Sequence, residues 1–381
     1  MNRNIINFDN SATTFPKPLE VRHAVSYAIR EYGGNAGRGG HKLSQKTSSA
    51  VFGARENIAD FFGAEPENVV FTLNCTHALN LAIQGIMSQG GHMIISELEH
   101  NSSARPAFEL LKKNKIKLSV ARVFPDDERT VKSFSELILP DTKAIVCTGA
   151  SNVTGQILPF RELAKLCNEK NICLIVDSAQ TSGIIDIKMS DGINILCTAG
   201  HKGLYGIAGT GLLISDGKFP IYPIIQGGTG SASSSLSQPM FLPDSLESGT
   251  LNVAGIMSVS AGIDFIKKTG RQKIFDHESC LCDILIDSLE NIPQIIIYRS
   301  PDAHYVPIIS FNVKDVNSEE VARILSENGF CLRAGFHCSA LAHNALGTDT
   351  GTVRFSPSVF NSEREVIAMA NLIKNLEIYK K

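Results

Sequence analysis

The chain has 381 residues, of which 43% are hydrophobic and 19% charged, and its formal net charge at pH 7 is −2. This composition supports a sizeable core and excludes a disordered chain, and the near-neutral charge argues against nucleic acid as a partner. No apolar run approaches the roughly 20 residues that cross a bilayer, so we expect no membrane association.

The nine cysteines do not suggest a disulfide framework, because their number is odd and they are scattered along a long chain. Most lie inside apolar runs such as 144–147 and 171–176, where a free thiol behaves as a small hydrophobic side chain. The first ten residues also lack the apolar core of a signal peptide. We therefore expect a protein of the reducing cytoplasm.

Helical and strand patterns alternate along the first half of the chain. A helix is expected over 16–33, with Val21, Ala24, Val25, Ala28, Ile29 and Tyr32 on one face. A second helix is expected over 46–62, ending at Gly63. Strands are expected at 68–73, 92–96, 116–122, 143–148 and 172–177, with helices between them. Short apolar strands separated by helices predict an α/β domain with a mostly parallel sheet covered on both faces.

The pattern changes after residue 193. Strands at 194–198 and 210–215 flank a glycine-rich bend, and a Gly/Ser-rich stretch follows at 227–237. Such a stretch is either a flexible linker or an ordered loop at a site or subunit interface. Beyond 255 a long helical region leads into a second α/β unit, whose later elements are expected as a strand over 305–313, a helix over 318–328 and a closing helix over 363–379.

Two residues at the ends of neighbouring predicted strands suggest chemistry. Asp177 closes an apolar strand, at the sheet edge where open α/β folds bind ligands, or it caps the next helix. Lys202 follows a strand and lies among glycines. It either forms a Schiff base or binds a phosphate without covalent chemistry. Pyridoxal phosphate needs both a lysine for its imine and an acid for its pyridinium nitrogen, and this pair supplies both.

Two further positions precede predicted helices. Thr76 lies at a strand-to-helix junction, where backbone N–H groups and its hydroxyl can hold a phosphate, or where it simply caps the helix. His100 follows a strand and can stack on a flat ring, or serve as an ordinary surface or capping histidine.

The segment 333–343 contains Cys338 among Gly, His and Ser. Positive charge on Arg333 and His337 would favour its thiolate, although an ordinary exposed cysteine is the alternative. A zinc site of Cys338, His337 and His343 is a weak possibility without a second ligand pair, so we expect no metal. Arg354 follows nearby and suits recognition of a carboxylate, or a surface ion pair.

Taken in order, these motifs resemble the cysteine desulfurases and selenocysteine lyases, within class V of the fold-type I pyridoxal-phosphate enzymes. The resemblance covers nearly the whole chain and is carried by residues 8–14, 99–101, 151–155, 176–180, 200–202, 247–250, 333–338 and 353–354. It implies a large cofactor-binding domain over 16–255, and a smaller α/β domain formed by 1–15 and 256–381 that carries the cysteine loop and the carboxylate-binding arginine.

The function that this resemblance implies is a pyridoxal-phosphate-dependent cysteine desulfurase, which converts L-cysteine to L-alanine and leaves the sulfur as a persulfide on an enzyme cysteine. A selenocysteine lyase, or another class V lyase or aminotransferase, is the alternative.

By position, the resemblance also implies which residues hold pyridoxal 5'-phosphate. Lys202 would form the imine and move the substrate's α-proton, and Asp177 would pair with the pyridine nitrogen. Gln180 would bond the ring oxygen, and His100 would stack on the ring and take part in catalysis. The phosphate would be held by Thr76 and His201 and, from a neighbouring subunit, by Thr250, which implies a homodimer with shared active sites.

The same comparison implies the substrate contacts. Arg354 would bind the substrate carboxylate, with Asn10 also on the substrate side. Asn152 would lie near the substrate amine or the cofactor's ring oxygen. Cys338 would be the nucleophile that forms the persulfide, and the other cysteines are expected to be buried or helical. The short segment around Cys338 is similar to the branch of the family that needs a sulfur-acceptor protein.

Two positions depart from the family pattern. Ala199 stands where the family often has Ser, which removes one hydroxyl from the expected phosphate site; Thr198 or Cys75 are the candidates to replace it. The stretch 227–239 is longer and richer in Ser than the family motif.

Overall fold

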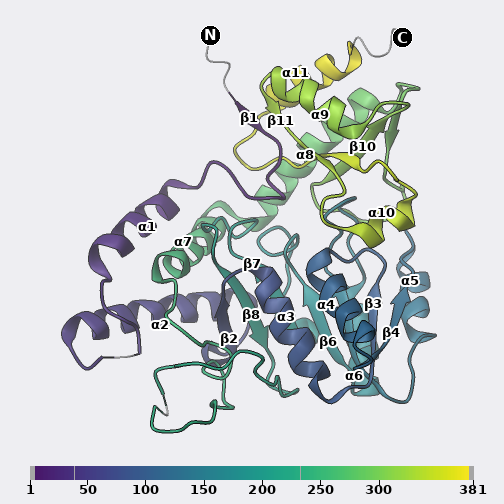
Figure 1. Ribbon diagram of the computed structural model, residues 1–381. Coiled ribbons are helices and arrows are strands. Elements are labelled where there is room, and N and C mark those ends of the chain that lie inside the picture. Colours follow the sequence, from purple (N-terminus) through teal and green to yellow (C-terminus); the bar gives the residue numbers. More distant parts are fainter. Residues whose placement is uncertain (1–4, 38, 232, 377–381) are drawn as a thin grey trace.

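The computed structural model describes residues 5–37, 39–231 and 233–376. Its largest element is a seven-stranded sheet with the strand order β2-β8-β7-β6-β5-β3-β4 (Figure 1). The strands are β2 (Val69–Thr72), β3 (His92–Ser96), β4 (Lys117–Ala121), β5 (Thr142–Thr148), β6 (Cys173–Asp177), β7 (Ile195–Ala199) and β8 (Gly211–Ser215). Only β8 runs antiparallel to its neighbours, so the predicted mostly parallel sheet is confirmed.

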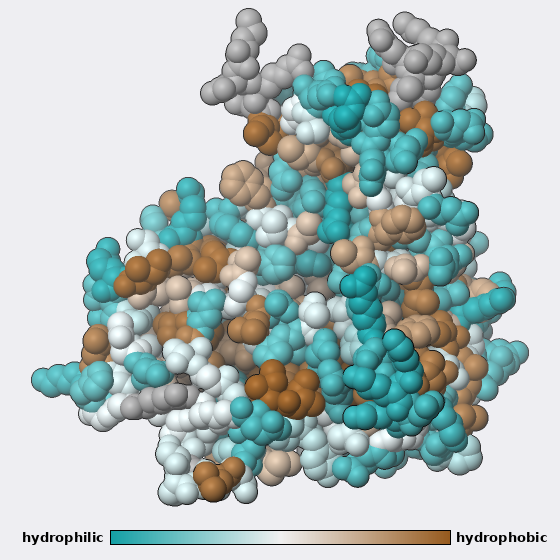
Figure 2. All heavy atoms as spheres, in the orientation of Figure 1, coloured by the Kyte–Doolittle hydropathy of each residue, from teal (hydrophilic) through white to brown (hydrophobic). Residues whose placement is uncertain are grey.

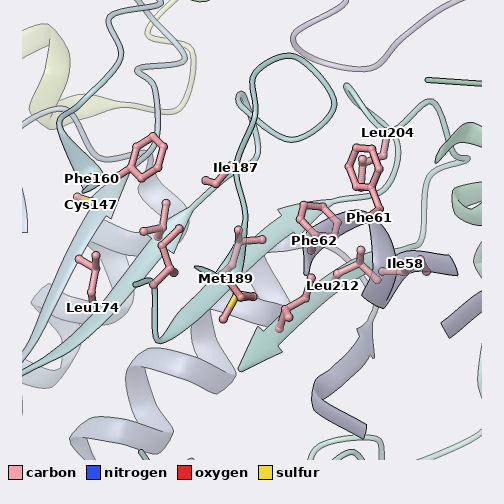
Figure 3. Close-up of a cluster of buried hydrophobic side chains, with 14 of the residues drawn as sticks. Ile58, Phe61, Phe62, Cys147, Phe160, Leu174, Ile187, Met189, Leu204 and Leu212 are labelled. Carbon is pink, nitrogen blue, oxygen red and sulfur yellow. The ribbon is translucent and has the colours of Figure 1, made fainter. Parts of the chain in front are cut away.

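Helices cover both faces of this sheet. On one face lie α3 (Cys75–Ile86) and α4 (Asn101–Lys112), whose apolar side chains pack with those of the central strands. On the other face lie α2 (Lys42–Phe62), α5 (Asp127–Ser135), α6 (Phe160–Lys170) and α7 (Val253–Thr269). Figure 3 shows part of this second core, in which Phe61, Phe62 and Phe160 pack with strand residues such as Leu174 and Leu212. The apolar strand sequences are therefore buried on both sides, as their composition requires.

A smaller unit lies above the sheet in Figure 1. Its antiparallel sheet has the order β12-β13-β10-β9, formed by β9 (Ile295–Ile297), β10 (Ile309–Val313), β12 (Arg333–Gly335) and β13 (Thr352–Phe355). The helices of this part are α8 (Arg271–Leu289), α9 (Ser318–Glu327), α10 (Ala340–Leu346) and α11 (Glu363–Lys374). Near the N-terminus, β1 (Ile6–Asn7) pairs in parallel with β11 (Phe330–Cys331). Phe8 is buried against Phe355 in this second unit.

The expected division between residues 255 and 256 falls inside α7. Val259, Ile263 and Ile266 of this helix belong to the core beneath the large sheet, and α7 contacts α1 (Leu19–Glu31) and α2. The C-terminal core contains Leu281, Leu285 and Phe311 instead. The two-domain division stays a prediction, and the packing of α7 with the large sheet favours a boundary after this helix.

Several predicted element bounds differ from the observed ones. β10 begins at Ile309 rather than at Tyr305 because Pro307 has no N–H to donate to a strand ladder. The closing helix ends at Lys374, with Asn375 as its C-cap, instead of continuing to 379; the positions from 377 lie outside the described residues.

Helix α1 (Leu19–Glu31) is shorter than the predicted 16–33. Its main contact is with α7, so its buried stripe is narrow and contains only Val21 and Ala28. Ile29, which we expected on the buried face, is 75% exposed. Helix α2 begins at Lys42, earlier than expected, because His41 provides an N-cap by accepting the Ser44 N–H.

The Gly/Ser-rich stretch 227–237 is irregular, and most of its described residues are exposed. The Gln238 amide donates to the backbone carbonyls of Asp244 and Ser245. It thus ties the end of the stretch to the segment that leads into α7. Of the two alternatives, these bonds favour an ordered loop over a free linker.

A buried ion pair anchors that same segment. The Arg55 guanidinium on α2 donates to both carboxylate oxygens of Glu247, at 2.8 and 2.9 Å. Glu247 also accepts the Phe71 N–H of β2 at 2.6 Å, and the guanidinium lies 4.3 Å above the Phe71 ring. The pair therefore joins helix, strand and loop in a region with little water.

We predict that Glu247→Gln lowers the free energy of unfolding by about 3–5 kcal/mol, because it leaves the Arg55 charge buried without its counter-charge. Urea unfolding of the two proteins measures this difference. Asp60→Asn, which removes an exposed partner of Lys267, is the matched control and should change little. Equal stability of wild type and Glu247→Gln would contradict the prediction.

Candidate active site

A cavity of about 200 Å³ lies at the carboxyl ends of β5, β6 and β7. Most of the predicted cofactor residues line it: Thr76, His100, Asn152, Asp177, Gln180, His201 and Lys202. β6 and β7 are adjacent and parallel, which is why residues after the two strands meet at one edge of the sheet.

Asp177 is the acidic residue at the floor of this cavity. One of its carboxylate oxygens, Oδ1, accepts the Ala179 N–H at 3.0 Å and the Cys75 thiol at 3.4 Å. Burial, followed by the nearby Asp177 charge, raises the pKa of the Cys75 thiol well above its ordinary value, so it stays a donor. A turn follows Asp177, not a helix, so the helix-cap alternative is wrong.

Lys202 is the basic residue of the cavity, and it is half-buried. Burial lowers the pKa of its amine, against the opposing effect of Asp177. A neutral amine is a nucleophile and a proton acceptor, so this environment suits Schiff-base chemistry better than simple charge pairing.

The backbone around Lys202 is held by the N-terminal segment. The His201 carbonyl accepts the Thr14 N–H at 3.1 Å and the Lys17 ammonium at 2.9 Å. The Thr14 hydroxyl also donates to the Lys202 carbonyl at 3.2 Å. On the other side, a Cβ at Gly262 of α7 would lie 1.9 Å from the Leu204 carbonyl oxygen. The loop is thus fixed between two segments distant in sequence.

His201 offers an unused polar atom beside the cavity. Its buried Nδ1 has no hydrogen-bond partner among the described residues. Burial, and then the positive charges of Lys202 and Lys17, lower its pKa to about 4, so the ring is neutral at neutral pH. An unsatisfied buried ring nitrogen is costly unless a ligand completes it, which fits a phosphate or another polar group here.

The N-terminus of α3 forms another wall. Its N-cap is Asn74, whose Oδ1 accepts the His77 N–H at 2.9 Å, so the alternative that Thr76 caps this helix is wrong. Thr76 lies in the first turn and is exposed toward the cavity.

Neither candidate for replacing the hydroxyl absent at Ala199 does so. The Thr198 hydroxyl is buried and donates to the Ser178 carbonyl at 3.3 Å, and the Cys75 thiol donates to Asp177. Both groups are used inside the fold, so that expectation is wrong.

His100 caps α4 and also lines the cavity. The capping alternative is confirmed, and stacking on a ring stays a prediction. Its Nδ1 accepts the Ser102 N–H at 3.0 Å and lies 2.7 Å from the Ser102 hydroxyl. Because Nδ1 is an acceptor, the neutral ring carries its proton on Nε2. Burial lowers its pKa to about 4, so this tautomer persists at neutral pH.

Cys338 lies in a four-residue connection between β12 and α10, with an exposed side chain. His337 and Cys338 both have positive φ, at 48° and 59°, a region that side chains other than glycine seldom adopt. Three contacts hold this loop. The Asn152 amide donates to the His337 carbonyl at 2.8 Å, the Ser339 hydroxyl donates to Asn152 Oδ1 at 2.6 Å, and the Cys338 carbonyl accepts the Asn101 N–H at 2.8 Å.

The charge beside Cys338 comes from arginine alone. Arg333 Nη2 donates to the sulfur at 3.3 Å, as expected for a residue that stabilises a thiolate. The expected help from His337 is wrong. Burial, and then the Arg354 charge, lower the pKa of His337 to about 2, so its ring is neutral. His337 Nε2 instead donates to the Thr352 carbonyl at 3.0 Å.

Arg354 is 1% exposed and lies on β13, directly across from Arg333. Its Nη1 donates to the Asn152 carbonyl at 3.0 Å and its Nη2 to Asp9 Oδ1 at 2.7 Å. The surface-pair alternative is therefore wrong, because the guanidinium is buried. Its Nε is buried and has no partner among the described residues.

The remaining predicted residues lie at the margins. Asn10 lines a small hollow beside Lys202 and Gln180, and Gln180 also donates to the Ser11 carbonyl at 3.3 Å. Thr250 is exposed and precedes α7, outside the set that lines the cavity. Cys331 is half-buried on β11, so the expectation that every other cysteine is buried or helical is wrong for it.

Several residues of the site are not predicted by the sequence patterns. Ser102 and Thr148 line the cavity, Asp9 pairs with Arg354, and Ser339 holds Asn152. Asp9 and Ser339 stand next to predicted site residues in their own motifs, and that position was the available signal.

Within the described ranges, no helix has the length and apolarity to span a bilayer, and no group of His, Cys, Asp or Glu forms a candidate metal site.

Comparison with known proteins fits this geometry. The family model for aminotransferase class V matches residues 6–369, so the chain belongs to that family, whose members of the cysteine desulfurase kind depend on pyridoxal phosphate. A probable cysteine desulfurase of Pyrococcus abyssi is 32% identical over 99% of this chain and 95% of its own. One from Methanothermobacter thermautotrophicus is 29% identical over 96% and 94%.

Solved structures support the same family assignment. The apo structure of a cysteine desulfurase from Thermococcus onnurineus superposes with a TM-score of 0.91 at 29% identity, covering 98% of this chain and 94% of that one. The cysteine desulfurase CsdA from Escherichia coli gives 0.87 at 25% identity over 98% and 95%. Within the class V aminotransferases, the chain therefore belongs to the cysteine desulfurase family, and the predicted fold-type I architecture is confirmed.

A buried carboxyl group next to this cavity makes stability depend on pH. Glu99 Oε1 accepts the Ser96 hydroxyl and the Thr148 N–H, both at 2.6 Å. Burial raises its pKa from 4.5 to about 8. Between pH 4.5 and about 8, the folded protein thus holds a proton that the unfolded chain has released. The free energy of unfolding therefore falls as the pH rises through this range.

We predict that Glu99→Gln, which cannot titrate, gains stability relative to wild type by about 1.4 kcal/mol per pH unit between about pH 5.5 and about pH 7.5. Urea unfolding at several pH values measures it. Glu20→Gln, at an exposed carboxylate whose pKa is below its ordinary value, should show no such slope. A constant difference between Glu99→Gln and wild type would overturn the assignment of a protonated Glu99.

Proposed function

We propose that the protein is a pyridoxal-phosphate-dependent cysteine desulfurase that converts L-cysteine to L-alanine and carries the sulfur as a persulfide on Cys338. The observation that carries the proposal is the meeting of Lys202 and Asp177 at one cavity, with Cys338 on the groove that adjoins it through His100. A transaminase needs the first pair but not a presented cysteine.

The residues present fit the cofactor. Asp177 would pair with its ring nitrogen, Gln180 would bond its ring oxygen and His100 would stack on its ring. Thr76 and the unpartnered His201 nitrogen lie where a phosphate would be held. When bound, the cofactor supplies an electron sink for negative charge at the substrate's α-carbon.

The chain's own groups supply the rest of the reaction. Lys202 Nζ, whose pKa is lowered by burial, accepts the α-proton of the substrate. The Cys338 thiolate, beside Arg333, attacks the substrate sulfur. The bond between the two sulfur atoms forms while the carbon–sulfur bond breaks, the carbon retains the electron pair, and its protonation gives alanine.

The substrate carboxylate is assigned to Arg354, with Asn10 nearby. Since Asp9 already accepts from Nη2, the substrate would use the unpartnered Nε of Arg354 or displace Asp9. Asn152 connects the two halves of the site, because its carbonyl accepts from Arg354 while its amide holds the Cys338 loop.

Two further features belong to the proposal. Thr250 would reach the phosphate of a second subunit in a homodimer; its exposed position, next to the anchored Glu247, supports this. A cytoplasmic location and a sulfur-acceptor protein are also proposed, since all nine cysteines are unpaired and the Cys338 loop is held in place.

Selenocysteine lyase is the second candidate, because the same residues bind an amino acid that differs in one atom. Assay of the purified protein with cysteine and selenocysteine, measuring sulfide, selenide and alanine, separates the two activities. Purified protein should also be yellow, and borohydride should fix the cofactor to Lys202. Colourless protein that cannot be reconstituted would end the proposal.

We predict that Cys338→Ala keeps the fold and the yellow cofactor but loses cysteine desulfuration by orders of magnitude, since the sulfur-removing nucleophile is gone. Alanine formation and the visible spectrum measure the two effects. Cys280→Ala, at the exposed cysteine of α8, is the control and should be fully active. Full activity of Cys338→Ala would favour an aminotransferase or another lyase.

We predict that Arg354→Lys raises KM for cysteine with little change in the cofactor spectrum, because lysine keeps the charge but loses the planar fork. Loss of a charge-assisted contact in a dry site costs about 2–3 kcal/mol, or a factor of about 30–150 in kcat/KM. Arg323→Lys on the exposed face of α9 is the control. Unchanged kinetics would show that another residue binds the carboxylate.

A further inference from the structure

A groove of about 780 Å³ adjoins the active-site cavity and has Cys338 and His100 at its inner end. Its two sides are α3 and α4, each of 12 residues and therefore about 18 Å long. Both helices begin at the site and run away from it. On α3 the groove is lined by Thr76, Asn80 and Gln84, on one polar helix face.

The α4 side of the groove is strongly basic. Arg105, Lys112, Lys113 and Lys115 line it, against the single carboxylate of Glu109. Glu109 pairs with Lys113 at 2.9 Å, and the other three cations are exposed and have no ion-pair partner in the described part of the chain. Figure 2 shows hydrophilic side chains gathered over α4 on this face. In a chain of net charge −2, this is a local concentration of positive charge.

The geometry of the Cys338 loop limits how sulfur can leave. The loop is short, and its carbonyls at His337 and Cys338 are hydrogen-bonded to Asn152 and Asn101. Such a loop does not carry its cysteine out to a distant acceptor. The acceptor thiol must come to Cys338, and the groove ends at that sulfur.

We propose that this groove, here called the α3–α4 groove, docks an acidic segment of a sulfur-acceptor protein and places its cysteine thiol against Cys338. The inference rests on the proposed function and adds the chemistry of the partner. Exposed Phe108, 41% accessible, also lines the groove, and it gives an apolar contact that suits a polypeptide better than a nucleic acid strand.

The transfer balances without another reactant. The acceptor thiolate attacks the outer sulfur of the Cys338 persulfide, a new sulfur–sulfur bond forms on the acceptor, and the bond to Cys338 Sγ breaks. Cys338 leaves as a thiolate, beside Arg333, and the proton of the persulfide stays on the transferred sulfur. No net oxidation or reduction occurs.

The test uses the full-length holoenzyme and two synthetic peptides, each with one cysteine and a single aromatic residue. The acidic peptide carries several Asp and Glu residues. The neutral peptide carries Asn and Gln at the same positions. The groove variant is Arg105→Gln/Lys112→Gln/Lys115→Gln. The control variant, Lys165→Gln/Lys170→Gln/Lys273→Gln, removes the same charge from exposed positions on α6 and α8. Alanine formation with dithiothreitol as acceptor should be equal in all three proteins.

Two measurements separate the docking site from the enzymatic activity. The first is the rate at which each peptide, activated as a thiopyridyl disulfide, forms a mixed disulfide with Cys338, which needs no desulfuration. The second is sulfur transfer from cysteine to each free peptide, followed by the added mass of one sulfur. We expect wild type and control to favour the acidic peptide by about tenfold or more at low salt, and less at high salt. The groove variant should lose this preference.

Equal rates with both peptides in wild type, or an unchanged preference in the groove variant, would overturn the inference even if cysteine is desulfurated. A preference seen in the disulfide reaction, in a protein that releases no sulfur from cysteine, would support the groove and end the desulfurase proposal. Blocking of the disulfide reaction by a single-stranded oligonucleotide, with no preference for the acidic peptide, would assign the basic face to nucleic acid instead.

Discussion

The site depends on the burial of an amine at the end of a β-strand. Lys202 follows β7 and is half-buried at the edge of the sheet, and desolvation disfavours the charged form of its amine. Such a residue is unfavourable unless its surroundings are fixed. The carboxylate of Asp177 lies on the adjacent strand, and the Lys202 loop is held from one side by Thr14 and Lys17 and from the other by the close approach of α7.

The second half of the site depends on one asparagine. Asn152 follows β5 and hydrogen-bonds with its amide and its carbonyl to two segments of the C-terminal unit, the Cys338 loop and β13. The Cys338 loop and the buried guanidinium of Arg354 are therefore positioned by the same residue. A shift between the large sheet and the smaller one would move both together.

The sequence predicted the bounds of the strands of the large sheet within about two residues, because each strand is a short apolar run. It also predicted that Asp177 and Lys202 lie at one edge of the sheet, because each stands at the carboxyl end of such a run. It did not predict contacts between distant segments. Examples are the ion pair of Asp9 with Arg354 and the hydrogen bond of Ser339 to Asn152. The hydrogen bonds that Thr198 and Cys75 make inside the fold are further examples. All of these depend on side-chain directions that no local pattern encodes. The neutral state of His337 was also missed, because it follows from burial beside Arg354 and not from its neighbours in sequence.

The pairing of the N-terminal residues has a consequence for the order in which the protein matures. β1 pairs with β11, the Asn10 amide donates to the Ser356 carbonyl, and Asp9 pairs with Arg354, across sequence separations of up to 346 residues. The same segment continues to Thr14 and Lys17, which hold the carbonyls beside Lys202. During synthesis the first residues emerge long before their partners, so these contacts form only when the chain is nearly complete. The strands of the large sheet are all present in the chain by Ser215, whereas the segment that holds the Lys202 loop gains its own support only once the C-terminal strands have formed.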